Sequence, residues 1–362
     1  MRLHNCEYCV HTLLALSRDN AAKILGKIMH IQRKSSMRRL CATLLPAIAF
    51  AHVAYGDVLH DHDNGPLTGY FGTPDSTEGS ILLNPGASRW GTMVMTANHS
   101  IGDDRTNESI ILDGETTRLE MTYRRGVKPG LEVGIELPYV WHESGGLDPL
   151  VDKWHDWFGL SGGFRDTRPQ DELEFLYSDE VGTQIDFRQN SRGMGDVRLF
   201  AGWQFRSDTS HTMALRLGVK LPTGDSDKLV GSGGTDVSLG VAGDVTDLFG
   251  VAGLDAYYRA NAIFVGEPDL LADRYNDFVG HLAFGLGYYL GDKVELRLQT
   301  AIRGALYDSD IETLGDSSTT LTFGGNIHLS PKYMLSIGVS EDIKVKSAPD
   351  VAFQLALHYQ PD

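Results

Sequence analysis

The feature that most constrains this chain is a two-residue alternation of apolar and polar side chains, repeated in segment after segment from about residue 90 onward. In 131–141, for example, Leu131, Val133 and Ile135 alternate with acidic residues or glycine. This period is typical of a strand with two unlike faces, and no comparable helical period runs through the chain. The pattern predicts twelve strands, of which the first alternates least regularly.

The connections between these segments are alternately short and long. Short ones include 126–130, 206–210 and 291–292, and long ones include 142–194 and 222–235. In an up-and-down meander all short turns then lie on one rim, the turn-side rim, and all long loops on the other, the loop-side rim. This layout predicts an all-β fold, a transmembrane antiparallel up-and-down β-barrel of about twelve strands in the outer membrane of a Gram-negative bacterium.

Aromatic residues at both ends of the apolar faces separate this prediction from a soluble sandwich, whose strands would also alternate. Tyr123, Trp203 and Tyr288 lie near predicted turns, whereas Tyr139 and Phe264 lie near predicted loops. Aromatic side chains of membrane proteins gather at the two lipid–water interfaces. The two groups therefore favour a barrel with a lipid-facing outer surface.

The first 56 residues differ in composition from the rest. They contain eight Lys and Arg and two acids, so the remainder carries 32 − 8 = 24 basic and 48 − 2 = 46 acidic residues, a net charge of −22. This excludes a basic nucleic-acid binder. Met37-Arg38-Arg39 before the apolar run 40–51 predicts a cleaved signal peptide over 37–56, and residues 1–36 are then a mis-assigned upstream extension.

Residues 57–88 are rich in glycine and proline and do not alternate, so we expect a periplasmic N-terminal strap or plug before the barrel at 89–362. The run His60-Asp61-His62-Asp63 offers four potential metal ligands, with a flexible acidic tail as the alternative. All three cysteines precede residue 57, and Cys6 and Cys9 have no second CxxC. No phosphate-binding loop or dinucleotide fingerprint follows, so no metal or cofactor is expected.

The polar faces of the predicted strands carry equal numbers of acids and bases. These lumen-facing charges are Arg118, Glu120, Arg124, Glu132, Glu136, Asp196, Arg198, Arg216, Lys220, Asp236, Asp244, Asp255, Arg259, Glu295, Arg297 and Arg303. A single-sign ring is the usual device of an ion-selective pore, whereas balanced charges can pair across a narrow lumen. We therefore expect an occluded or narrowly gated lumen, with an open channel as the alternative.

The longest predicted loop contains a short amphipathic helix, residues 147–158, which ends at Gly159. Four roles are open for it: lying on the outer leaflet, folding inward as a lid, docking an apolar ligand, or capping the rim. Its apolar face is expected to consist of Leu147, Leu150, Val151, Trp154, Trp157 and Phe158.

Several short segments resemble one known family. They are 84–90 (NPGASRW), 112–119 (LDGETTRL), 133–139 (VGIELPY), 154–160 (WHDWFGL), 221–225 (LPTGD) and 231–236 (GSGGTD). Together they resemble the proteobacterial outer-membrane family catalogued as domain-of-unknown-function family 3187, over roughly residues 65–360. The resemblance implies export and a barrel, and it assigns no catalytic residue. The LPTGD hairpin is also similar to one in barrels linked to uptake of aromatic compounds.

The expected partners are outer-membrane lipid, lipopolysaccharide and the outer-membrane assembly machinery. Because the chain does not end in an aromatic residue, we expect that machinery to recognise Leu355, Leu357 and Tyr359. The leading hypothesis is a channel or transporter for a small solute, an apolar one in its narrower form, with the loop helix as gate or first contact.

Two other functions fit the same sequence pattern. One is a non-conducting structural barrel. The other is a lipid-acting hydrolase through His142 and Ser144, since some outer-membrane lipases resemble a barrel with a His-x-Ser pair. We expect the protein not to be an enzyme, because no third group that would orient His142 is evident in the sequence.

Overall fold

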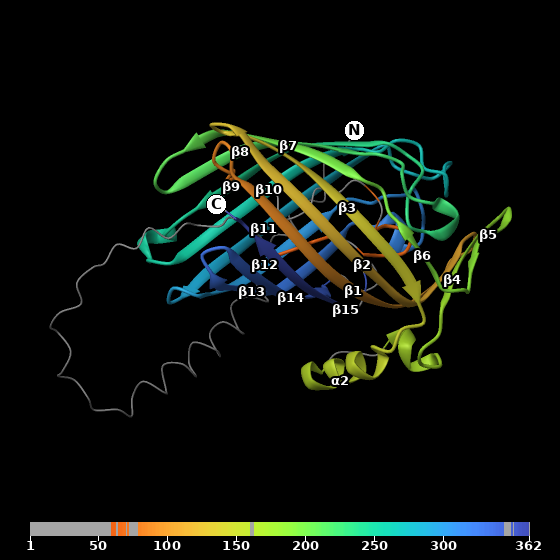
Figure 1. Cartoon of the computed structure of the whole chain (residues 1–362). Coiled ribbons are helices and arrows are strands. Elements are labelled where there is room, and N and C mark those ends of the chain that lie inside the picture. Colours follow the sequence, from red (N-terminus) through yellow and green to blue (C-terminus); the bar gives the residue numbers. More distant parts are fainter. Residues whose placement is uncertain are drawn as a thin grey trace, which may run out of the picture. The chain divides into compact units, whose positions relative to one another are not determined.

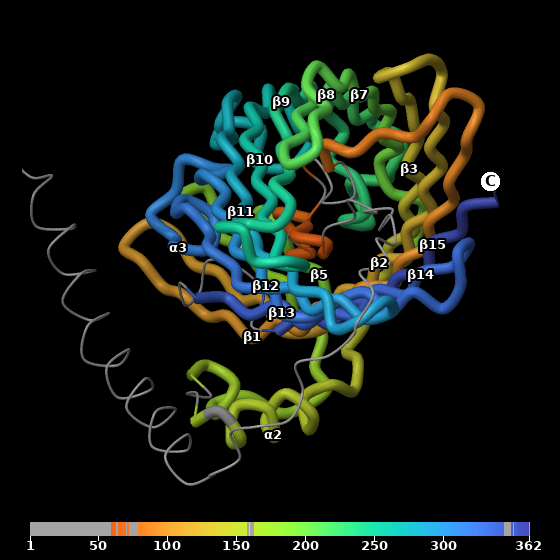
Figure 2. Tube along the Cα trace, turned by 90° about the vertical axis from the view of Figure 1, so that its left-hand side faces the viewer, coloured from red at the N-terminus to blue at the C-terminus, as the bar shows by residue number. Residues whose placement is uncertain are grey.

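The computed structural model describes residues 59–62, 64–69, 71, 79–159, 163–343, 349 and 351–361, so the predicted upstream extension and signal peptide lie outside it. Within these residues, twelve antiparallel strands close into a ring, in which each strand pairs with its neighbours along the chain and β15 pairs with β1 (Figures 1 and 2). The predicted up-and-down barrel is confirmed. The ring strands are β1 (Ser88–Asp104), β2 (Ser109–Lys128), β3 (Leu131–Glu143), β7 (Arg198–Ser207), β8 (His211–Lys220), β9 (Asp236–Val245), β10 (Leu254–Phe264), β11 (Phe278–Leu290), β12 (Val294–Arg303), β13 (Ser318–Ser330), β14 (Tyr333–Asp342) and β15 (Val351–Tyr359).

Alternation in the sequence becomes an inner and an outer surface. On β11, Leu282 and Phe284 point outward and are about half exposed, whereas His281 and Ala283 point inward and are buried. A strand places successive side chains on opposite faces. A shift of one residue in the pairing of this strand would therefore turn all its outward apolar side chains toward the lumen. Closure is set by β1 and β15, which pair without interruption from Trp90 with Tyr359 to Asn98 with Val351.

Strand β3 pairs with two different strands on the same side. Its first half, Leu131–Glu136, pairs with β7, and its last residues pair with the short strand β6 (Ser191–Met194). Pro138 lies at the change and lacks an N–H to donate, but its carbonyl accepts the N–H of Gly195 at 2.9 Å. Strand β6 therefore continues the wall on the loop side of β7.

The longest loop contains more secondary structure than its sequence predicts. The expected helix is present as α2 (Asp148–Phe158), and it ends at Gly159 in the left-handed conformation. It is followed by η2 (Gly163–Thr167) and by the hairpin of β4 (Glu174–Asp179) and β5 (Gly182–Phe187), which extends the sheet from β2. The remaining short helices are η3 (Ser226–Lys228), η4 (Leu248–Gly250) and α3 (Glu312–Gly315). No helix in the described part is long and apolar enough to cross a membrane.

Candidate functional site

One side of the lumen is a charged sector, formed by inward-facing residues of β2, β3, β7, β8 and the adjoining loop ends. At its turn-side end, Glu132 is 0% exposed and accepts hydrogen bonds from Arg124 and Arg216, with N–O distances of 2.9 and 3.0 Å. Its second oxygen also accepts the backbone N–H of Leu83 at 3.0 Å. The two guanidiniums compensate this buried carboxylate for the loss of water.

A second group of the charged sector lies midway along the barrel. Arg118 donates to Glu120 and to Glu136, both at 3.0 Å, and Arg198 lies 3.5 Å from the other oxygen of Glu136. All four side chains are buried. The three strands β2, β3 and β7 thus bring together charges that lie up to 80 positions apart in the sequence.

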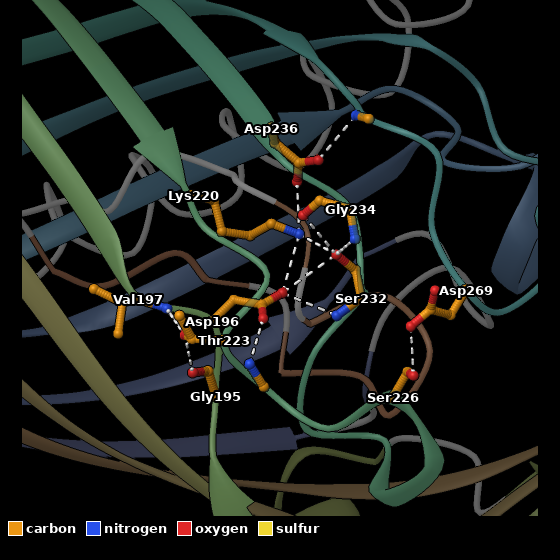
Figure 3. A network of polar contacts seen from close by, with 12 residues as sticks. Gly195, Asp196, Val197, Lys220, Thr223, Ser226, Ser232, Gly234, Asp236 and Asp269 are labelled. Carbon is orange, nitrogen blue, oxygen red and sulfur yellow. Dashed lines mark hydrogen bonds and ion pairs between the residues drawn. The ribbon is translucent and has the colours of Figure 1, made fainter.

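At the loop-side end of this sector, Lys220 lies between two carboxylates (Figure 3). Its Nζ is 3.1 Å from Asp196 and 3.1 Å from Asp236, and it also donates to the Ser232 hydroxyl. Asp196 in turn accepts the backbone N–H groups of Gly224 and Ser232, at 2.8 and 2.9 Å. These bonds fix the connection between β8 and β9, which contains the LPTGD and GSGGTD segments, against the inner wall.

The remaining predicted lumen charges lie on β9, β10 and β12. Four of them have partners on the same strand, in the next loop or in the segment before β1. Glu295 pairs with Arg297 at 2.7 Å, and Arg303 donates to the Gly304 carbonyl at 3.0 Å. Asp244 accepts the Ser80 N–H at 3.1 Å. Asp255 is only partly buried and accepts the Asp247 N–H of the adjoining turn at 3.0 Å. The last, Arg259, contacts the N-terminal segment.

The N-terminal segment, defined as the described residues 59–71, lies inside the ring (Figure 2, orange). The His60 backbone donates to the Gln354 side chain and accepts from it, both at 2.9 Å. Asn64 donates to the carbonyl of Thr116 at 2.7 Å, and Asp61 lies 2.5 Å from Arg259. Side-chain and backbone contacts therefore join this segment to β2, β10 and β15.

The wall beside this segment is a neutral sector. Its buried inward-facing side chains on β13, β14 and β15 include no acid, lysine or arginine: they are Ser318, Thr322, Asn326, Met334, Ser336, Ser340, Ala352, Gln354, Ala356 and His358. Ala352 and Ala356 also pack with Met93, Met95 and Ala97 of β1. Because most of these side chains are short, they leave room along one side of the lumen, and the described residues of the N-terminal segment lie in it.

The loop-side end of the lumen is filled by apolar side chains. We call this group the mouth cluster: Leu67, Phe71, Ile101, Ile110, Leu112, Leu173, Phe175, Tyr177, Ile185, Leu229, Ile263, Val265, Leu271, Val279, Leu306, Tyr307, Ile311 and Leu314. The N-terminal segment belongs to it, since Tyr307 packs edge-on against Phe71 and donates to the Leu67 carbonyl at 2.8 Å. Burial also raises the pKa of Tyr177, whose hydroxyl donates to Glu108 at 3.2 Å.

The predicted loop helix does not cover the lumen. Trp154 of α2 donates to Glu341 at 3.2 Å and packs edge-on against Phe353, and both partners face outward from the barrel. Of its predicted apolar face, Val151 is buried, Trp154 and Leu147 are partly buried, and Leu150 and Trp157 are exposed. The Phe158 side chain lies outside the described part. The idea that this helix gates the lumen is therefore wrong for this structure.

Two candidate motifs have other partners. The Nε2–H of His142 donates to the Leu229 carbonyl at 2.8 Å, and its Nδ1 lies 2.9 Å from the Thr116 hydroxyl. Both ring nitrogens thus have partners other than Ser144, so His142 is not arranged as a base for that serine. In the His60–Asp63 run, Asp61 pairs with Arg259, and His62 bonds the Gly69 carbonyl at 2.5 Å. Asp63 is not described, and among the described residues no group of three ligands is placed to hold a metal.

Sequence reasoning missed the hairpin that contributes to the mouth cluster. Phe175, Tyr177, Ile185 and Phe187 alternate with polar or less buried residues, which is the same signal that identified the wall strands. The many acids between residues 171 and 180 obscure this signal, because runs of acids are usually solvated. A count of alternating pairs on either side of Gly182 would have indicated two short strands.

Among solved structures, the COG4313 outer membrane channel from Pseudomonas putida F1 shares the fold, with a TM-score of 0.52 and 12% identity over 78% of this chain and 98% of that one. The toluene transporter TbuX of Ralstonia pickettii matches with a TM-score of 0.39 and 11% identity over 83% and 98% of the two chains. No curated protein matches the sequence.

A sequence profile of one protein family matches residues 37–360. This range contains every ring strand and all the segments that carried the resemblance seen in the sequence. The chain therefore belongs to the family described as "Protein of unknown function (DUF3187)", and its fold is that of an outer-membrane β-barrel.

Proposed function

We propose that this barrel is a gated channel for a small apolar solute and that the N-terminal segment is its plug. The observation that carries the proposal is that the lumen is filled by a segment that is not part of the wall. In a purely structural barrel, the inward side chains of the strands fill the interior by themselves. Here most side chains of the neutral sector are short, and the described residues of the N-terminal segment lie beside them.

The chemistry of the lumen supports an apolar solute. The loop-side entrance consists of the apolar mouth cluster, and the path beneath it runs along uncharged side chains of β13–β15. The charged sector lies across the lumen, and its acids and bases are engaged with one another. A solute that moves along the neutral sector therefore leaves the ion pairs of the charged sector intact. Release of the plug does separate the buried pair Asp61–Arg259, which costs several kcal/mol and would keep the channel closed at rest.

Single-channel recording in planar bilayers tests the plug. Deletion of residues 59–71 removes the segment without shortening a wall strand, so we expect it to convert a mostly closed barrel into one with steady current. Asp61→Asn weakens the contact with Arg259 and should give brief openings more often than the unmodified chain. Asp208→Asn, in an exposed turn, is the matched control and should leave the current unchanged.

Uptake of an apolar and a polar probe by whole cells tests whether the solute is apolar. Cells whose outer membrane carries the deletion variant should take up radiolabelled toluene faster than cells with the unmodified chain, with a smaller effect on glucose. Heat-modifiable migration in electrophoresis verifies folding of each variant. A folded deletion variant that conducts no current and takes up no probe would favour the non-conducting structural barrel instead.

A further inference from the structure

We infer that α2 is a membrane-contacting helix, which lies on the outside of the barrel with its exposed apolar stripe among the acyl chains of the outer leaflet. This surface is separate from the lumen and from the proposed channel function. Figures 1 and 2 show α2 outside the ring of strands, on the side of β1, β14 and β15.

Two polar residues at the loop-side ends of β1 and β2 hold the start of the longest loop against the outer wall of the barrel. Asn98 and Glu115 have the same strand parity as the outward-facing Trp90 and Met121, yet they are only 1% and 4% exposed. Glu115 accepts the N–H groups of Gly146 and Leu147, at 2.9 and 2.5 Å. Hydrogen bonds to Glu115 thus place residues 146 and 147, which precede α2, on the outer surface of the barrel.

A buried ion pair then fixes the start of the helix. Asp148, the first residue of α2, accepts from Asn98 at 2.9 Å and from Arg165 at 2.5 Å, and it also accepts the Asp171 N–H at 2.8 Å. Since Arg165 lies in η2, the two helices are joined through one carboxylate. The helix is therefore held at a defined height on the wall.

The helix lies beside the loop-side end of the lipid-facing surface of β15. Trp154 packs on Phe353, and the next outward residues of the same strand, Leu355 and Leu357, are about half exposed. In a transmembrane barrel, outward apolar side chains of this kind face hydrocarbon. The apolar surface of α2 thus continues the lipid-facing surface of β15.

The helix has the two flanks that an interfacial position requires. At 3.6 residues per turn, Leu150, Trp154 and Trp157 lie along one stripe, and Leu150 and Trp157 are 42% and 72% exposed. The exposed residue Asp156 lies on a different flank, which water can solvate. A helix with this division lies in the membrane plane, with its apolar side about 5–10 Å below the headgroup boundary.

Spin labelling tests this arrangement in the full chain. With Cys6, Cys9 and Cys41 changed to Ser, single labels at Trp157→Cys and, as the matched control, Asp156→Cys report the two flanks in vesicles of phosphatidylethanolamine and phosphatidylglycerol. We expect the label at 157 to be relaxed more by oxygen than by a water-soluble nickel chelate, at a depth of about 5–10 Å, and the label at 156 to show the reverse.

Other outcomes overturn the inference. Equal nickel accessibility at 156 and 157 places the whole helix in water. Dipolar broadening at 157 with low accessibility to both reagents means that a second copy of the chain covers the stripe. Leu150→Cys repeats the measurement at a second position, and Val133→Cys on the barrel wall gives the lipid-facing reference. None of these labels touches the lumen, so failure here leaves the channel proposal standing.

Discussion

The two sides of the lumen differ in how they are filled. In the charged sector, wall residues fill the space themselves, and Glu132 alone contacts Arg124 and Arg216. In the neutral sector, the wall provides short side chains such as Ser340 and Ala352, and a separate segment of chain occupies the room they leave. Both sides are closed, but only the second can be opened without breaking the wall's own contacts.

This difference explains where the barrel is rigid and where it can change. Removing one member of a buried ion pair leaves the other charged and without water, which is strongly destabilising. Separating the N-terminal segment from β15 breaks neutral hydrogen bonds, each worth about 0.5–1.5 kcal/mol net. Its complete release also separates Asp61 from Arg259 on β10, a contact between the segment and the wall and not one within the wall. The charged sector is therefore the rigid side, and the neutral sector is the side on which the proposed plug would be released.

The largest expected effect is in the charged sector. Glu132→Ala leaves Arg124 and Arg216 without their shared acceptor, so we expect a loss of about 3–5 kcal/mol in the free energy of unfolding. Urea unfolding of the refolded chain, followed by loss of the heat-modifiable band, measures it. Glu132→Gln keeps one acceptor oxygen and should lose less. A Glu132→Ala variant as stable as the unmodified chain would contradict the rigid-side assignment.

A smaller effect is expected in the neutral sector. At Gly338 an added Cβ would lie 2.9 Å from Cγ of Gln354, the side chain that holds the His60 backbone. Gly338→Ala should therefore displace Gln354, cost about 1–3 kcal/mol and make the N-terminal segment easier to cleave.

The measurement is the rate at which chymotrypsin cuts at Phe71, together with urea unfolding. Gly280→Ala is the matched control, because no heavy atom lies within 4 Å of its added Cβ. Equal cleavage rates in the two variants would show that Gln354 does not hold the segment.

The smallest effect is expected outside both sectors, in a turn. The Arg206 guanidinium, 2.8 Å from Asp208, holds the pKa of that carboxyl below its ordinary value. Arg206→Ala should return the pKa of Asp208 upward, as seen by NMR titration of labelled aspartate. Stability from a lowered carboxyl pKa exists only above the ordinary pKa and vanishes as the pH falls through the lowered one. Both side chains are nearly half exposed, so no change in the urea midpoint is expected at neutral pH.

Much of this architecture follows from the sequence. Alternation and connection lengths predicted the ring, because the strand period and the turn lengths are local properties. Strand order in an up-and-down barrel is sequence order, so the positions of the charged and neutral sectors around the lumen can also be inferred from the sequence. The predicted inward charges run from Arg118 to Arg303, and from Ser318 onward the buried inward residues include no acid, lysine or arginine.

Three features were decided only by the tertiary structure. The N-terminal segment is held by contacts such as His60 with Gln354, which lie 294 positions apart and leave no periodic signal. The placement of α2 outside the wall depends on Asn98 and Glu115, two polar residues at outward positions. Their partners, Asp148 and Gly146, lie in the longest loop and reach them only when that loop folds back onto the wall. The mouth cluster joins residues from many separate loops, so no single stretch of sequence contains it. Local periodicity specifies a wall, but what fills or covers that wall depends on contacts between distant segments, which exist only once the barrel has closed.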